Sequence, residues 1–145
     1  AWNNLILEES DKYNISNMIR QDDIIYDIDI VMARNADVSI QSMEANEPPF
    51  YNKEYIQGVI DSYDLDGKSG TGIVFINEYM SKSSENAVFH FVLLDMSSKK
   101  ILLYQKCWVE PFGFGIRNYW AGSILNVMKQ IRKSHYKRWK KQFSN

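Results

Sequence analysis

The chain of 145 residues contains very few of the residues that build cross-linked, metal-bound or irregular structures. Its single cysteine, Cys107, excludes an intrachain disulfide and a zinc site of the CxxC type. The only two histidines, His90 and His135, lie too far apart in the sequence to suggest a metal site. Seven glycines and three prolines are too few for long disordered linkers. The sequence therefore predicts one ordered domain, residues 1–145, that has no metal or other cofactor.

Long apolar runs and catalytic motifs are also missing. The best apolar run, at 73–76, is far too short to cross a bilayer, so no membrane-spanning helix is predicted. The sequence has no GxSxG or HExxH motif, and the glycine pair near residue 113 lacks the third glycine of a dinucleotide fingerprint. Because His90 and Cys107 lie in apolar strand-like segments, we expect both to be core residues. An enzymatic role is therefore less expected than a binding role.

Acidic residues are absent from residues 111–145, which hold eight of the 17 basic residues. Residues 1–110 consequently contain all 18 acidic residues and nine basic ones, so the two parts carry formal charges of −9 and +8. Such asymmetry indicates an anionic partner for the basic part. The acidic body of the same molecule is an alternative partner.

Hydrophobic periodicity in the first half predicts two helices and one strand. A short helix is expected over 14–21, and 24–31 alternate apolar with acidic residues, as in a half-buried strand with Asp27 and Asp29 facing water. Asn52 can cap a helix with one apolar face, which consists of Tyr55, Ile56, Val59, Ile60 and Tyr63.

Three further strands are predicted over 72–80, 87–95 and 101–109. The polar links between them are too short for a parallel crossover, so the strands should form an antiparallel meander over about 72–109. The continuous apolar runs at 73–76 and 91–94 indicate that both faces are covered at those points.

These elements together define the predicted fold. It is an α+β domain, a two-layer sandwich with an antiparallel sheet of about four strands. The 53–63 helix and a long C-terminal helix, over about 116–141, are expected on one face of the sheet.

The C-terminal helix combines an apolar stripe with basic faces. The stripe consists of Ile116, Trp120, Ile124, Val127, Met128, Ile131, His135 and Trp139. Candidate contacts for an anionic partner are Lys133, Lys137, Arg138, Lys140 and Lys141. An ordinary solvated helix has the same pattern. We expect this helix to dock on its own acidic domain, with its last turns projecting beyond the body.

The nature of an anionic partner is left partly open. Nucleic acid is disfavoured, because Trp120 and Trp139 fall on the stripe and only Tyr136 is free to stack on bases. Peripheral contact with anionic lipid and contact with an acidic protein both remain open.

A glycine-rich aromatic corner precedes the C-terminal helix. Its glycines permit unusual backbone angles, and the helix start supplies free N–H groups, so the corner is a candidate site for a small anion. The candidate residues are Gly113, Gly115, Arg117, Asn118, Tyr119 and Trp120. A tight corner packed by aromatic side chains is the alternative interpretation.

The order helix, three strands and long helix, over about residues 52–140, resembles the TolB N-terminal and CsgG-like domains of bacterial envelopes and related secreted lipoproteins. The likeness lies in the segment 72–80, in FVLLD at 91–95 and in ILLY at 101–104, which frame a hairpin ahead of the last helix. In place of the Thr-Gly common in such hairpins, this chain has SSKK at 97–100. The resemblance implies a periplasmic or secreted location and a scaffolding role, and it brings no catalytic residues.

The leading functional hypothesis is a non-enzymatic envelope or secreted interaction module with protein partners. One alternative is a binder of nucleic acid or another anionic surface through the basic helix, and another is a small-anion binder or enzyme centred on Arg117. The chain begins with Ala1, and the sequence leaves open whether a signal segment was removed or the chain was trimmed for expression.

Overall fold

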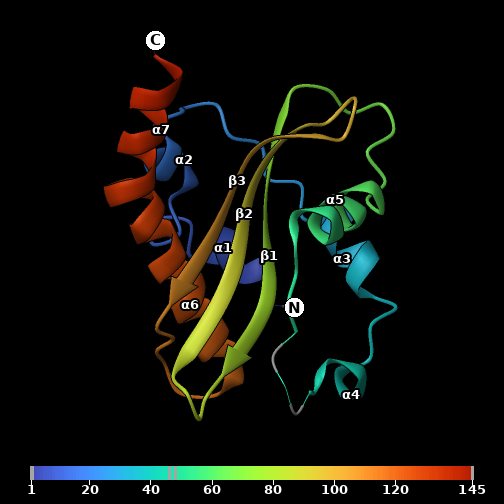
Figure 1. The fold of residues 1–145 in the computed structure, drawn as a ribbon, viewed down its shortest axis with the longest axis vertical. Coiled ribbons are helices and arrows are strands. Elements are labelled where there is room, and N and C mark those ends of the chain that lie inside the picture. The colour runs from blue at the N-terminus through green and yellow to red at the C-terminus, as the bar shows by residue number, and fades with distance from the viewer. Residues whose placement is uncertain (1, 46, 48, 145) are drawn as a thin grey trace.

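A three-stranded antiparallel sheet forms the centre of the molecule (Figure 1). The computed structural model describes residues 2–45, 47 and 49–144. Strands β1 (Thr71–Ser81), β2 (Asn86–Asp95) and β3 (Lys100–Val109) follow one another in space as they do in the sequence. The predicted meander is therefore confirmed.

The expectation of about four strands is wrong within the residues that the structure describes. Residues 24–28 pair with no strand, and α3 (Asp29–Asn35) begins where the predicted strand should continue. The alternation of Ile and Asp was short, and Asp29 instead occupies the first helical turn, where a carboxylate interacts favourably with the helix dipole. Ile30 and Val31 of this helix pack against the second apolar cluster described below.

Helices cover both faces of the sheet, so the predicted two-layer arrangement is wrong and the domain has three layers. On one face, Phe89, Phe91 and Cys107 pack against the C-terminal helix and the N-terminal helices α1 (Asn4–Glu8) and α2 (Ile15–Ile19). On the other face, Val92 and Leu94 pack against α5 (Lys53–Asp61). Odd and even residues of β2 point to opposite faces, and both sets are buried. The prediction that both faces are covered at 73–76 and 91–94 is confirmed.

Helix α5 starts as predicted. The Asn52 side chain accepts a hydrogen bond from the Tyr55 N–H at 2.8 Å, which satisfies one of the unpaired donors of the first turn. Ile56, Val59 and Ile60 are buried, whereas Tyr55 of the predicted apolar face is exposed. The short helix α4 (Ile40–Met43) lies in the preceding connection.

The C-terminal helix runs through three consecutive segments, α6 (Ile116–Gln130), a π-helical turn η1 (Ile131–His135) and α7 (Tyr136–Phe143). Its buried residues 127, 131 and 139 are separated by four and eight positions. In a regular α-helix, every four residues advance about 40° beyond a full turn, so these side chains would gradually rotate away from the sheet. The wider π turn takes up the excess and brings Trp139 back to the sheet. Trp139 is buried and stacks on Phe91, with ring centroids 5.5 Å apart, so the helix remains docked to this point rather than projecting.

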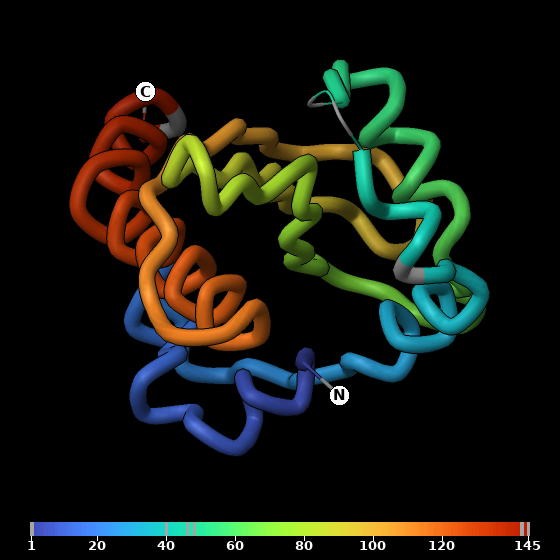
Figure 2. The backbone as a smooth tube through the Cα atoms, turned by 90° about the horizontal axis from the view of Figure 1, so that it is seen from below, coloured from blue at the N-terminus to red at the C-terminus, as the bar shows by residue number. Residues whose placement is uncertain are grey.

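The two edges of the sheet differ in what covers them. Figure 2 shows the N-terminal third of the chain crossing on the β1 side, from the C-terminal helix to the α3–α5 side. The Tyr13 hydroxyl ties this segment to the C-terminal helix by donating to the Ala121 carbonyl at 3.2 Å. Strand β3 forms the opposite edge. Across the described residues, none of the helices combines the length and apolar character needed to cross a bilayer.

Candidate functional site

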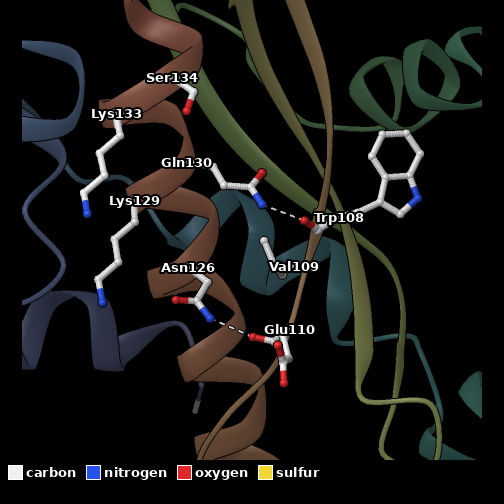
Figure 3. A pocket seen from close by; sticks show the side chains of 8 residues that line it. All are labelled: Trp108, Val109, Glu110, Asn126, Lys129, Gln130, Lys133 and Ser134. Carbon is white, nitrogen blue, oxygen red and sulfur yellow. Dashed lines mark hydrogen bonds between the residues drawn. The ribbon is translucent and has the colours of Figure 1, made fainter.

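The outer edge of β3 is half closed by side-chain amides. In an antiparallel edge strand, alternate residues direct both backbone groups outward. The Trp108 carbonyl accepts from Gln130 Nε2 and the Glu110 carbonyl from Asn126 Nδ2, each at 2.6 Å (Figure 3). The Lys106 carbonyl accepts from Gln105 Nε2 at 2.9 Å. These three outward carbonyls therefore already have hydrogen-bond partners.

A groove, here called the helix groove, lies where the capped half of β3 meets the C-terminal helix. It has a volume of about 320 Å³ and is lined by residues 108–110 of β3 and its end, and by Asn126, Lys129, Gln130, Lys133 and Ser134. Figure 3 shows Lys129 and Lys133 extending away from the strand, so their ammonium groups lie at the rim. The Trp108 side chain points away from the helix and is 57% exposed.

A second groove, here called the edge groove, follows the other half of β3. It has a volume of about 420 Å³ and its floor consists of residues 101–105. Lys53 of α5 lines it on one side, and Arg138, Trp139 and Gln142 of α7 line it on the other. Arg138 donates to Gln105 Oε1, which orients the guanidinium along the strand. Both grooves therefore combine an edge of β3 with cationic side chains.

The basic side chains of the C-terminal helix form no ion pair with any carboxylate that the structure describes. Lys133, Lys137, Arg138, Lys140 and Lys141, here called the basic face, are all exposed. Among the described residues, no side chain of the basic face lies within 4.0 Å of a carboxylate. The helix does dock on its own domain, as expected, but among the described residues no ion pair of the basic face contributes to that docking. The apolar stripe holds the helix in place, which leaves the cations facing solvent.

The aromatic residues near the basic face are turned toward the protein. Trp139 is buried, and Trp120 is half-buried against Trp2 with ring centroids 5.7 Å apart. The Arg20 guanidinium lies 4.5 Å from the ring centroid of Tyr136, which covers one face of that ring. His135 stacks on Trp139, and burial, followed by the nearby charge of Arg138, lowers the pKa of its imidazole.

The glycine-rich corner has the unusual backbone that was predicted. Gly113 and Gly115 have φ of +119° and +79°, and a Cβ at Gly113 would lie 2.7 Å from the Asn118 carbonyl oxygen. Arg117 is exposed, and its Nη1 lies 3.4 Å from Asn118 Oδ1. The Arg117 guanidinium thus meets the Asn118 oxygen, while Asn118 Nδ2 donates to the Phe114 carbonyl at 2.9 Å. An anion site here stays a prediction.

The aromatic members of the corner serve packing instead. The Tyr119 hydroxyl donates to the Ser81 carbonyl at 3.3 Å, and Trp120 packs on Trp2. Arg117 lines neither of the two grooves along β3. Ile116, expected on the buried stripe, is 68% exposed, because the packed face of the helix begins only further along α6.

Gly122 and Gly58 make a matched pair for a stability test. A methyl group at Gly122 would overlap the Phe112 carbonyl oxygen, which is backbone and cannot rotate away. Gly122→Ala should therefore lower the free energy of unfolding by about 1–3 kcal/mol. Gly58, in α5, has open space at the same position, so Gly58→Ala should raise it by about 0.5–1 kcal/mol. Urea unfolding of both variants measures the difference, and equal effects would contradict the close contact at Gly122.

A buried polar cluster lies on the α5 face of the sheet, and one of its members, Tyr104, also lines the edge groove. Glu78 Oε1 lies 3.2 Å from His90 Nε2 and 2.7 Å from the Tyr51 N–H, which donates to it. Lys106 Nζ is 3.4 Å from Glu78 Oε2. Burial lowers the pKa of His90, although the hydrogen bond to Glu78 opposes this shift. A neutral His90 can donate from Nε2 to Glu78 while Nδ1 accepts from the Tyr104 hydroxyl at 2.7 Å.

The expectations for His90 and Cys107 are confirmed. His90 is completely buried and hydrogen-bonded on both ring nitrogens. Cys107 is buried in the apolar cluster under the C-terminal helix, and this burial raises the pKa of its thiol to about 12. Such a thiol is held protonated at neutral pH and acts as an apolar residue. Within the described residues, no three His, Cys, Asp or Glu side chains are placed to hold a metal ion.

The residues that build the two grooves were only partly visible in the sequence. Lys133 and Arg138 were singled out for their charge, whereas Asn126, Gln130 and Lys53 were not. Asn126 and Gln130 are four positions apart on one side of the helix, and this spacing was the available signal. No protein-family model, curated protein or solved structure matches this chain.

Proposed function

We propose that this domain is a non-enzymatic interaction module that binds an acidic protein partner through the basic face of its C-terminal helix. One observation carries the proposal: in a domain rich in carboxylates, the exposed cations of this helix have none of them within ion-pair distance among the described residues. Like charges gathered on one surface repel one another. An oppositely charged partner removes this repulsion when it binds, and this gives the cluster a function.

An acidic protein fits the surface better than a nucleic acid does. Binding of single strands relies on exposed aromatic rings for base stacking. On the C-terminal helix, Trp139 is buried and Tyr136 is covered on one face by Arg20. The exposed Trp108 of the helix groove points away from this helix (Figure 3). The basic face also adjoins two grooves that contain backbone and amide groups, which suit recognition of a polypeptide.

We further propose that the partner is met in the cell envelope or outside the cell. The resemblance to TolB N-terminal and CsgG-like domains supports this location. The only thiol is buried, so the domain exposes no cysteine that could mispair in an oxidising compartment. Fractionation of the source cells tests the location, and a protein found only in the cytoplasm would contradict it.

The binding test compares two double variants that remove the same charge. Lys137→Gln/Lys141→Gln should weaken binding of fluorescent poly-glutamate roughly two- to thirtyfold, because each exposed ion pair contributes about 0.2–1 kcal/mol. Lys12→Gln/Lys82→Gln, far from the basic face in the sequence, should bind like the parent. Fluorescence anisotropy at two salt concentrations measures both, and binding should weaken with salt.

Two results would contradict the proposal. Equal weakening by the two double variants would mean that only net charge matters. Tighter binding of a DNA duplex than of poly-glutamate at the same ionic strength would favour a nucleic-acid partner instead.

A further inference from the structure

The edge groove exposes the outer side of β3 at 101–105, whose inner side pairs with β2 and whose outer side pairs with no other described segment. Tyr104 lies two and four residues before Lys106 and Trp108, so by alternation its N–H and C=O point outward. Among the described residues, no backbone group outside the sheet bonds to β3 at 101–105. The amide caps begin only at Lys106, and the open stretch coincides with the groove floor.

The groove lies where a fourth strand of the sheet would lie. It lies outside β3, between α5 on one face and α7 on the other, so a chain entering it would continue the sheet plane between the two helical layers. Its floor of five residues, 101–105, spans roughly 17 Å at the rise of an antiparallel strand. Leu102 is 51% exposed at an irregularity in the β2–β3 register and offers an apolar contact at this edge.

Charge specifies what can enter this groove. Lys53 on the α5 side and Arg138 on the α7 side are its two charged lining residues, and none of the lining residues is acidic. Side chains of an added strand point alternately to the two faces, so carboxylates on it can reach either cation. A segment with basic side chains would be repelled from both sides.

We infer that an extended acidic segment of the partner adds to β3 as a fourth strand, with its backbone bonded at Tyr104 and its carboxylates at Lys53 and Arg138. Strand addition of this kind obtains affinity from main-chain hydrogen bonds and specificity from the flanking side chains. The inference rests on the proposed function, because it specifies how the acidic partner of the basic face is held.

The test uses a fluorescent peptide of alternating glutamate and valine and an analogue that is N-methylated at every residue. The analogue keeps the carboxylates but has no N–H to donate to the strand. It should bind at least roughly tenfold more weakly, since several backbone hydrogen bonds are lost. The Tyr104 amide should become protected from hydrogen exchange when the unmodified peptide is added.

A rim variant separates this inference from the proposed function. Lys53 lies in α5, outside the C-terminal helix. Lys53→Gln should weaken binding of the unmodified peptide roughly two- to fivefold. Equal binding of the peptide and its N-methylated analogue would overturn the strand addition. If Lys137→Gln/Lys141→Gln still weakened both peptides, the proposed function would stand without it. Protection of Tyr104 that grows with protein concentration alone would assign the edge to a second copy and overturn the inference too.

Discussion

Replacing Glu78 by alanine should lower the free energy of unfolding by about 3–5 kcal/mol, the usual cost of breaking a buried ion pair from one side. The Glu78 side chain is almost fully buried, and its oxygens meet the Tyr51 N–H, His90 Nε2 and Lys106 Nζ. Alanine would leave these groups inside the protein without an acceptor. A buried donor without a partner loses its hydration and gains nothing in return.

Chemical unfolding measures this effect, and two variants control for it. Glu8→Ala removes an exposed carboxylate and should change the free energy of unfolding by less than about 0.5 kcal/mol. Glu78→Gln keeps an acceptor oxygen and should recover part of the loss. If Glu78→Ala unfolded like Glu8→Ala, the cluster would not contribute to stability.

Trp139→Ala should lower the free energy of unfolding by about 3–5 kcal/mol, as expected for removing a buried tryptophan from a packed site. Trp139 is 9% exposed and stacks between Phe91 and His135, with ring centroids at 5.5 and 5.8 Å. The three residues that follow it, 140–142, are exposed, so the loss of Trp139 should also release α7 from the sheet.

The release of α7 can be measured separately from global stability. Amide exchange of residues 136–142 should accelerate in Trp139→Ala more than exchange of β2, because the stack of Trp139 on Phe91 anchors α7 to the sheet. Trp139→Phe should retain most of the protection, and Lys140→Ala, at an exposed neighbour, should leave it unchanged. Uniform acceleration across the chain would show that α7 and the sheet unfold as one unit.

Local sequence patterns predicted the elements of the second half well. Apolar segments separated by short polar links predicted the three strands, and in the first half Asn52 predicted the start of α5 as the structure has it. These features depend on neighbours in sequence, which is why they can be read without the fold. The strand predicted over 24–31 was wrong because four alternating residues fit a strand and a short helix equally well. Only the packing of Ile30 and Val31 on the second apolar cluster decides between the two.

The three-layer arrangement follows from one feature of the sequence. Continuous apolar runs at 73–76 and 91–94 indicated coverage of both faces, and this conflicts with helices on a single face. The charged surface was harder to predict. Whether Lys137 meets a carboxylate depends on where the acids of the first half fold, and no local pattern carries that information.

The amides of Asn126 and Gln130 connect the C-terminal helix to the backbone of β3 and not only to its side chains. A load applied by a bound partner to the basic face would therefore pass into β3 through these two bonds, and into β2 through the stack of Trp139 on Phe91. The helix runs antiparallel to β3 (Figure 1), so a pull along its axis shears β3 against β2 instead of peeling the strands apart one pair at a time. Shear loads all bonds of the ladder together, so this geometry makes the sheet the mechanically resistant part of an attachment at the C-terminal helix.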